Sequence, residues 1–451
     1  MLKRITQSQN LYKYLTAVIL LIIPLYPKFP FLKIPGAQVS ARVEDFLLAL
    51  AALFLTVKIL PQVKKVFSMS IESAIAIYIL IGLISLLSAI FLTRTVVPHI
   101  GFLHWTRRVE YIIPFFLGVL AIKKKENLNF YLNILIVVSF IVFIYAIGQR
   151  YFYWPIIVTQ NLEYAKGIAL RYVAGGHINS TFAGHYDLAT FLVLILPIFI
   201  SLFFIIKRLK VRIILGIMIL SGLWLLIASV SRISIASYLF GSTIALLILK
   251  KYKEIIIIFL VSLILFSFSQ DLRVRYLRIF DEAKRRLGEI SVTVYAQETY
   301  PERRTDFATP TPTPQPILED RSSSIRLNVE WPRAIRAFTK NPLLGTGYSS
   351  ITLATDNDYL RAVGETGLLG FFGFSLIIIS FIRLIISKIT SSKDMFSGIQ
   401  KAFLAGMAGG LSGILVNALF IDVFEASKFA IIFWLLMGLL VGLIREDEYY
   451  E

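Results

Sequence analysis

The densest group of polar residues in the sequence lies between Thr355 and Glu365, directly before a hydrophobic run. Asp356, Asn357 and Asp358 suit the N-terminus of a helix, where they cap free backbone N–H groups and interact favourably with the helix dipole. A carboxylate there can equally act as a general base that takes a proton from a hydroxyl group. Capping does not explain Glu365, about two turns further along. We therefore take Asp356, Asn357 and Glu365 as candidate catalytic residues, with Asp358 as a secondary candidate.

Three arginines stand out by position: Arg171 comes immediately before the polar segment 175–187, Arg232 lies at the end of two closely joined hydrophobic runs, and Arg326 lies in the longest polar stretch. An arginine at the end of a membrane span can extend to lipid phosphates, which explains any one of them without a function. A guanidinium group also offers two parallel N–H donors to phosphate oxygens, so the three together suit a bound pyrophosphate. The residues alone leave both interpretations open.

Two histidines, His177 and His185, lie in the segment Gly175-Gly-His-Ile-Asn-Ser-Thr-Phe-Ala-Gly-His-Tyr-Asp187. With Asp187 they offer metal-ligating atoms, but their spacing matches no established ligand pattern. Water in a polar loop can satisfy the imidazoles instead. We expect no metal here and keep His177 and His185 as secondary site candidates.

The composition indicates a protein that lies in a lipid bilayer. Hydrophobic residues make up 57% of the 451 residues and charged residues 16%, and the mean hydropathy is +0.74. Water-facing domains of ordinary size could not bury this much apolar surface, and fibrous, disordered and disulfide-framework classes are excluded as well. The net charge of +18 is explained first by cytoplasmic loops and anionic lipid, so we expect no nucleic-acid partner.

The hydrophobic runs predict an all-α polytopic membrane protein of about twelve transmembrane helices. Because this number is even, both termini are expected on the same side of the membrane. The runs cover approximately residues 12–26, 44–60, 70–92, 109–122, 129–148, 186–206, 213–229, 233–249, 254–269, 366–387, 400–421 and 429–444.

Clusters of basic residues predict which side is cytoplasmic. They fall on the side of both termini, as the positive-inside rule requires, so we expect a cell (inner) membrane location with cytoplasmic termini. Isolated basic residues on the other side, including Arg171 and Arg232, need another reason to be there. The clusters are Lys3/Arg4, Lys58/Lys64/Lys65, Lys123–Lys125, Lys207/Arg208/Lys210/Arg212, Lys250/Lys251/Lys253 and Arg383/Lys388/Lys393.

The longest polar stretch, 270–365, falls between the ninth and tenth predicted spans and is therefore expected outside. It separates spans one to nine, in 1–269, from spans ten to twelve and a cytoplasmic tail, in 366–451. Its first part, 273–287, suits a helix on the membrane surface or one packed on the rest of the loop. The repeated prolines of 308–316 favour an extended linker.

The end of this stretch is predicted to be ordered. Trp331, Ile335 and Phe338 recur at near-helical spacing, and the helix is expected to stop at Asn341-Pro342. A glycine-rich turn, Gly345-Thr-Gly347, follows.

Four stretches on the predicted outer side form a recognisable series. They are Arg171 with Asn179-Ser-Thr-Phe-Ala-Gly-His-Tyr-Asp-Leu-Ala; Ser231-Arg232; Arg326 through Trp331 to Asn341-Pro-Leu-Leu-Gly-Thr-Gly347; and Asp356-Asn-Asp-Tyr-Leu with Glu365-Thr-Gly-Leu-Leu-Gly370. Over roughly 165–445, the sequence resembles the family of O-antigen ligases and O-antigen polymerases, membrane glycosyltransferases that use lipid-linked sugars.

The resemblance implies a GT-C-like membrane fold and metal-independent transfer of a glycan, with no cofactor. The implied partners are a polyprenyl-pyrophosphate-linked donor, a glycan or lipid-glycan acceptor and membrane lipids, with the active site on the outer face. Arg171, Arg232 and Arg326 would bind the donor pyrophosphate and offset charge that develops as it leaves.

In the same scheme Asp356 would be the general base, with Asn357 and Glu365 orienting it or the acceptor. Ligases of the family usually carry histidine where this chain has Asp356, which favours a polymerase or a generalised glycan transferase. A lipid flippase or transporter is the first alternative, and Asn417 with the small residues of 406–413 is its best support. Close helix packing explains those small residues more simply. A receptor or scaffold that binds a partner through the large, partly Pro-rich outer loop is another alternative.

Overall fold

The computed structural model describes residues 9–26, 30–33, 40–122, 127–156, 172–173, 176–267, 325–352, 354–391 and 396–445. Arg171, the segment 273–287 and the Pro-rich segment 308–316 lie outside these residues, and so does most of the predicted outer loop.

Helices dominate the described chain, and its described strands form one two-stranded antiparallel ribbon. The elements are α2 (Gln9–Leu25), β1 (Pro30–Lys33), β2 (Ser40–Arg42), α3 (Val43–Ile59), η1 (Leu60–Gln62), α4 (Val63–Val66), α5 (Ser70–Phe91), α6 (Pro98–Ala121), α7 (Asn127–Tyr151), α9 (His185–Ile205), α10 (Leu209–Ser229), α11 (Arg232–Ile248), α12 (Tyr252–Ser267), η2 (Arg326–Glu330), α15 (Trp331–Lys340), α16 (Asp358–Thr390), α17 (Gly398–Asn417), η3 (Val423–Glu425) and α18 (Ser427–Ile444).

The structure confirms a multi-pass helical membrane protein. The described part of every predicted hydrophobic run lies mostly on a helix, and 8 described helices, with α3 to α4 taken as one, are long and apolar enough to cross a membrane. Helices α2 and α11 are shorter apolar helices. Helix α6 carries four polar or charged residues, His104, Arg107, Arg108 and Glu110, close to its middle. The total of about twelve spans and the position of the large loop stay predictions.

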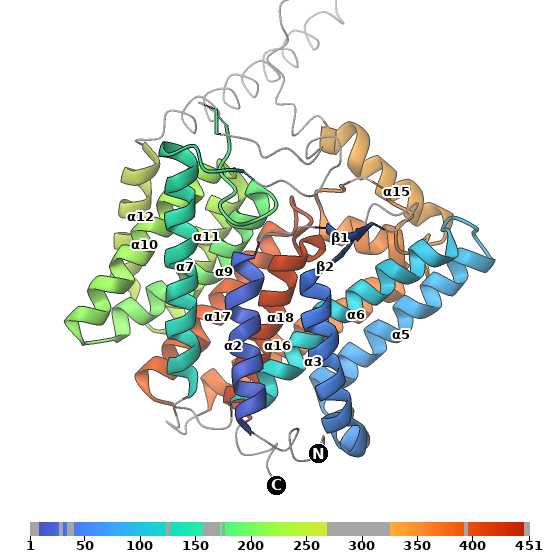
Figure 1. The fold of residues 1–451 in the computed structure, drawn as a ribbon, viewed down its shortest axis with the longest axis horizontal. Coiled ribbons are helices and arrows are strands. Elements are labelled where there is room, and N and C mark those ends of the chain that lie inside the picture. Colours follow the sequence, from blue (N-terminus) through green and yellow to red (C-terminus); the bar gives the residue numbers. More distant parts are fainter. Residues whose placement is uncertain are drawn as a thin grey trace, which may run out of the picture.

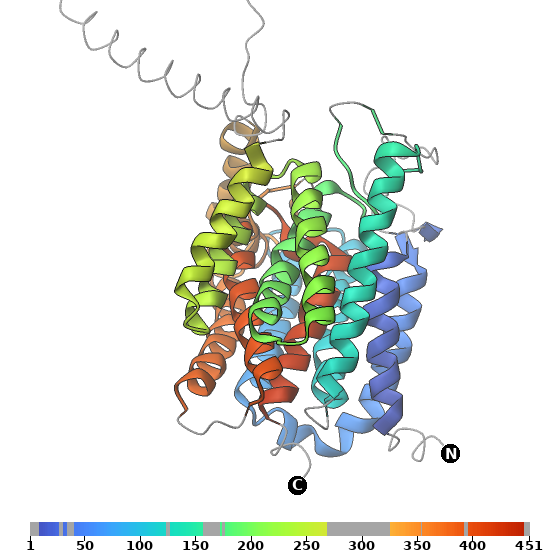
Figure 2. The ribbon, with the colours of Figure 1, turned by 90° about the vertical axis from the view of Figure 1, so that its left-hand side faces the viewer.

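Helices α9, α17 and α18 form the core, which the other helices surround (Figures 1 and 2). Glycines allow the close approach there. A Cβ atom on Gly438 of α18 would lie 2.1 Å from the carbonyl oxygen of Phe115 in α6. On Gly409 of α17 it would lie 2.2 Å from the carbonyl oxygen of Gly241 in α11. The small residues of 406–413 therefore serve helix packing, as predicted.

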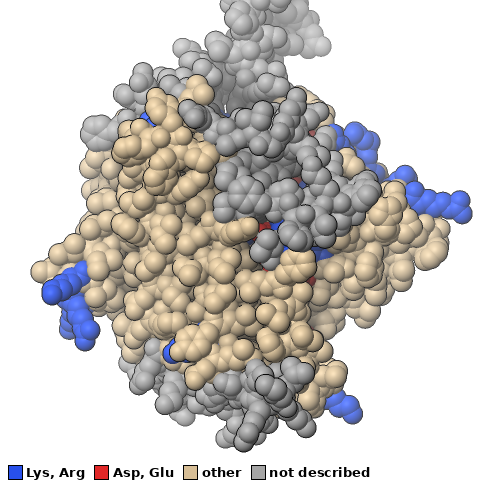
Figure 3. All heavy atoms as spheres, viewed as in Figure 1, with Lys and Arg blue, Asp and Glu red and all other residues tan. Residues whose placement is uncertain are grey.

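The two ends of the bundle differ in chemistry. We call polar end the one where α2 ends and α9, α16 and α18 begin. Nζ of Lys428, at the start of α18, donates there to the carbonyl oxygens of Pro24 (3.1 Å) and Thr181 (2.6 Å). Helices α3 and α16 finish at the opposite end, where Lys58 and Lys388 lie in their last turns. Uncharged residues cover most of the described surface between the ends (Figure 3).

Helix α16 contains a break that separates its polar start from its apolar remainder. Gly367 has φ +68°, a left-handed conformation that glycine adopts without steric cost. Beyond the break, the N–H groups of Leu368 and Leu369 donate to the carbonyl oxygens of Pro342 (2.9 Å) and Leu343 (3.1 Å). Asp358 to Thr366 thus form a short polar helix held by the turn that follows α15.

Candidate active site

Helix ends from distant parts of the sequence meet at the polar end. Asn417, at the end of α17, accepts a bond from Ser234 of α11 (3.0 Å) and donates to Thr190 of α9 (2.9 Å). The next residue, Ala418, accepts the N–H of Asp358 at the start of α16 (3.0 Å). These bonds bring α9, α11, α16 and α17 together around one polar region.

Arg326 and Asp356, both predicted site residues, form an ion pair in this region. Nε and Nη2 of Arg326 donate to Oδ2 of Asp356 at 3.0 and 2.8 Å. The Asp356 side chain remains 22% exposed, so a substrate can reach it. Burial raises the pKa of Asp356 above its usual value; Arg326 opposes this effect and the nearby Asp422 adds to it.

Aromatic side chains from the start of α9 extend this pair. Burial lowers the pKa of Arg326, but Asp356 and a hydrogen-bonded Tyr186 raise it more, so the net change is upward. Tyr186 packs on His185 with ring centroids 4.1 Å apart, and His185 stacks on His177 at 4.2 Å. The structure therefore brings both predicted histidines into the neighbourhood of Arg326 and Asp356.

Asn357 and Asp358 anchor the start of α16. Oδ1 of Asn357 accepts the N–H of Leu360 at 2.9 Å, which confirms the capping explanation for this residue. Oδ2 of Asp358 accepts the N–H groups of Val423 (2.7 Å) and Phe424 (3.3 Å), in the loop before α18. Asp358 thus ties two chain segments together.

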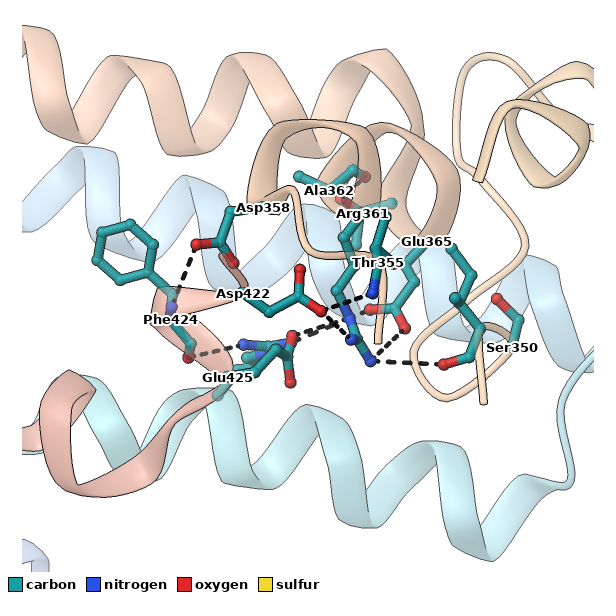
Figure 4. Close-up of polar contacts among 12 residues, drawn as sticks. Ser350, Thr355, Asp358, Arg361, Ala362, Glu365, Asp422, Phe424 and Glu425 are labelled. Carbon is teal, nitrogen blue, oxygen red and sulfur yellow. Dashed lines mark hydrogen bonds and ion pairs between the residues drawn. The ribbon is translucent and has the colours of Figure 1, made fainter. Parts of the chain in front are cut away.

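A charge network joins the start of α16 to the segment before α18 (Figure 4). Its centre is Arg361 of α16, whose Nη1 donates to Oδ2 of Asp422 at 3.0 Å. Nη2 of Arg361 lies 3.5 Å from Oε1 of Glu365, and its Nε lies 3.1 Å from Oε1 of Glu425. Three carboxylates therefore surround one guanidinium group, and the arrangement fixes the loop before α18 against α16.

Glu365 is the most deeply buried of the predicted catalytic residues, with 2% of its surface exposed. Nη2 of Arg108, from α6, lies 4.0 Å from Oε2 of Glu365, and the same arginine pairs with Glu425. Arg108 also lies over the ring of Tyr348, 5.7 Å from its centroid. Glu365 is thus held between arginines from two helices.

Arg232 begins α11 at the polar end, as predicted. The preceding residue, Ser231, is buried and shares a hydrogen bond of 2.7 Å with Ser234, which in turn bonds Asn417. This chain of polar contacts fixes the start of the helix that carries Arg232. Among the described residues, no group of three or more His, Cys, Asp or Glu side chains could hold a metal ion.

Sequence reasoning missed four charged residues of the network: Arg108, Arg361, Asp422 and Glu425. Arg361 stands inside the predicted motif, and the other three fall between or beside hydrophobic runs on the predicted outer side. A charged residue so close to a membrane span usually has a charged or polar partner, so the sequence indicated that these residues are paired. It could not say which partner, because Arg361 and Asp422 are separated by 61 positions.

Residues 217–375 match the family model described as O-Antigen ligase. This part of the chain is similar to the O-antigen ligase family, and we call it the O-antigen ligase domain after the model that it matches. The match confirms the predicted family resemblance, and the O-antigen ligase domain contains Arg232, Arg326, Asp356 and Glu365. Arg108, Asp422 and Glu425 contribute to the same network from outside it. No curated protein matches the chain.

Proposed function

We propose that the chain is a glycosyltransferase that moves a glycan from a polyprenyl-pyrophosphate carrier to an acceptor hydroxyl, as an O-antigen polymerase or ligase. The observation that carries this proposal is the Arg326–Asp356 pair within the O-antigen ligase domain. It joins a carboxylate that can accept a proton to a guanidinium group that can bind phosphate.

In the proposed reaction, the acceptor oxygen attacks the anomeric carbon of the donor sugar. The bond from that carbon to the pyrophosphate oxygen breaks, and polyprenyl pyrophosphate departs with the electron pair. The hydroxyl proton passes to Asp356. Because burial raises the pKa of Asp356, this carboxylate is a stronger base than an exposed aspartate.

The arginines take the leaving group in this scheme. Arg326 offers Nε and Nη2 together, the two-donor geometry that suits phosphate oxygens. A pyrophosphate has to compete with Asp356 for this guanidinium group. When the pyrophosphate binds Arg326, the Asp356 carboxylate is released and can accept a hydrogen bond from the acceptor hydroxyl. Arg232 and Arg171 would complete the anion site and offset the charge that develops in the transition state.

The outer face of the cell membrane is the proposed location of this chemistry. Lys58, Lys64, Lys65 and Lys388 lie at the end of the bundle opposite the candidate site. Under the positive-inside rule, that end faces the cytoplasm and the polar end faces outward. A lipid-linked donor would reach the site from the outer leaflet.

Asp356→Asn tests the base. We expect a loss of transfer rate of about 10²–10⁴-fold, the usual contribution of general base catalysis, with purified protein and polyprenyl-pyrophosphate oligosaccharide. The wild-type rate should rise with pH as Asp356 loses its proton. Because burial raises the pKa of Asp356, the midpoint of this rise should lie above about 3.9, the ordinary pKa of aspartate. Wild-type transfer by the variant at equal protein level would overturn the assignment.

The matched control is Asp45→Asn. Oδ2 of Asp45, at the start of α3, also accepts a hydrogen bond from an arginine side chain, Nη2 of Arg107 at 3.0 Å, together with the backbone N–H of Arg42 at 2.8 Å. This variant should keep the wild-type rate. Sizing the products then separates the two activities: a ladder of lengthening glycans indicates a polymerase, and one addition to a separate acceptor indicates a ligase. No product with either acceptor would count against both.

A further inference from the structure

Asp422, in the loop between α17 and α18, accepts hydrogen bonds from the backbone on both sides of Asp356. Its Oδ2 accepts the N–H of Thr355 at 2.8 Å, and its Oδ1 accepts the N–H of Asn357 at 3.0 Å. One carboxylate thus bonds both sequence neighbours of the proposed base, with a different oxygen for each. Only 10% of the Asp422 side chain is exposed.

The contact is reciprocal. Asp358, two residues after Asp356, accepts the N–H groups of Val423 and Phe424, the two residues that follow Asp422. Each segment therefore supplies one carboxylate and two N–H donors to the other, which gives four hydrogen bonds between them. Arg361 bonds Asp422 at 3.0 Å and keeps its carboxylate oriented.

The backbone conformation of Asp356 explains why these hydrogen bonds are needed. Its φ is +50°, in the left-handed region that residues other than glycine adopt at a cost in energy. A residue of this kind keeps its conformation only where the surroundings impose it. Hydrogen bonds to the preceding and the following N–H groups impose it from both sides, and they direct the Asp356 side chain toward Arg326.

We propose that Asp422 is a positioning residue for the transfer reaction, which holds Asp356 at the angle that proton transfer requires. The proposal rests on the proposed function, in which Asp356 is the base. Asp422 lies outside residues 217–375, so the O-antigen ligase domain would depend on the loop before α18 for the geometry of its own base.

Kinetics of Asp422→Asn test this role. The amide keeps one acceptor oxygen and places N–H donors where Thr355 and Arg361 donate. The hydrogen bond to the backbone on the Thr355 side of Asp356 is therefore lost. We expect kcat to fall by about 100-fold, the effect of a displacement of about 1 Å at a reacting group, with the KM for the donor changed less than about 3-fold. Asp45→Asn should keep both constants.

The pH profile supplies a readout that a merely structural role would not move. The groups that act on Asp356 are Arg326, which lowers its pKa, and Asp422, which raises it, while Glu330 interacts with it from η2. Removal of the Asp422 charge should therefore lower the pKa of Asp356 and move the acid limb of kcat to lower pH. A wild-type kcat and an unmoved limb in folded Asp422→Asn protein would overturn the proposal.

Thiol chemistry tests the positioning without any need for activity. The chain has no cysteine, so Asp356→Cys introduces a single thiol. Its rate of reaction with a polar maleimide should rise at least about 3-fold when Asp422→Asn is added and stay constant when Asp45→Asn is added. Equal rates in all three proteins would overturn the positioning role. Wild-type transfer by Asp356→Asn would instead overturn the proposed function, so the two failures are distinguishable.

Discussion

At the scale of single residues, the central finding is that the proposed base and a proposed phosphate ligand bind each other. Two donors of Arg326 point at one oxygen of Asp356. The resemblance to the O-antigen ligase family predicted that Arg326 binds the donor pyrophosphate and that Asp356 takes the proton of the acceptor. It did not predict that the two residues bind each other. Competition between the donor and the carboxylate for one guanidinium group follows from the geometry and can be measured.

Asp356→Asn should therefore strengthen the binding of polyprenyl pyrophosphate while it removes transfer. Without the competing charge, we expect about 10-fold tighter binding, which corresponds to about 1.4 kcal/mol. In an Arg326→Gln background the same change should have little effect, since no guanidinium is left to compete for. Titration of the four proteins of this cycle with the lipid in detergent gives the coupling.

General electrostatics would produce a different result in the same cycle. Loss of one negative charge near a phosphate site tightens binding in either background. Equal gains with Arg326 and with Gln at this position would therefore contradict direct competition. Asp45→Asn, which removes a carboxylate paired with Arg107, should leave the affinity unchanged.

At the scale of helices, close packing between α6 and α18 positions two parts of the charge network. Helix α6 carries Arg108, and Glu425 lies just before α18. Gly438→Ala would place its Cβ atom 2.1 Å from the carbonyl oxygen of Phe115 and push these helices apart. We expect a loss of about 1–3 kcal/mol in the free energy of unfolding, as overpacked cores show. Thermal unfolding in detergent measures it.

Gly216→Ala is the matched control for this substitution. Its Cβ atom would meet only a side-chain carbon of Phe203 at 3.4 Å, so stability should change little. Equal stability of the two variants would mean that α6 and α18 have room to separate. A loss of transfer activity confined to Gly438→Ala would connect the packing to the network around Arg108.

The helices themselves were largely predictable, because long apolar runs have few alternatives in a bilayer. The turn after α15 also followed from Asn341-Pro342 and the glycines beyond it. The network was harder to predict. Capping accounted for Asn357, but the partners of Asp358 are 65 and 66 positions away. No local pattern specifies a contact of that span, and only the packing of α16, α17 and α18 creates it.

At the scale of the whole molecule, the two ends of the bundle carry different kinds of charge pair. The polar end holds the partly exposed Arg326–Asp356 pair, with side chains 12% and 22% exposed. The opposite end contains Glu72 of α5 and Arg445 beyond α18, which are 0% and 7% exposed and joined at 3.0 and 3.1 Å. They lie 373 positions apart, so this pair fastens an early helix to the last described one.

Glu72→Leu should be strongly destabilising, by about 3–5 kcal/mol, because it leaves the Arg445 guanidinium buried beside an apolar side chain. Adding Arg445→Met should recover most of this loss, since a buried ion pair can be replaced by packed apolar groups at little net cost. Thermal unfolding of both proteins in detergent tests the difference. Transfer activity of the folded double variant should equal that of the wild type, because the pair lies at the end opposite Asp356. A double variant as unstable as Glu72→Leu, or one that folds without activity, would show that this pair does more than join α5 to α18.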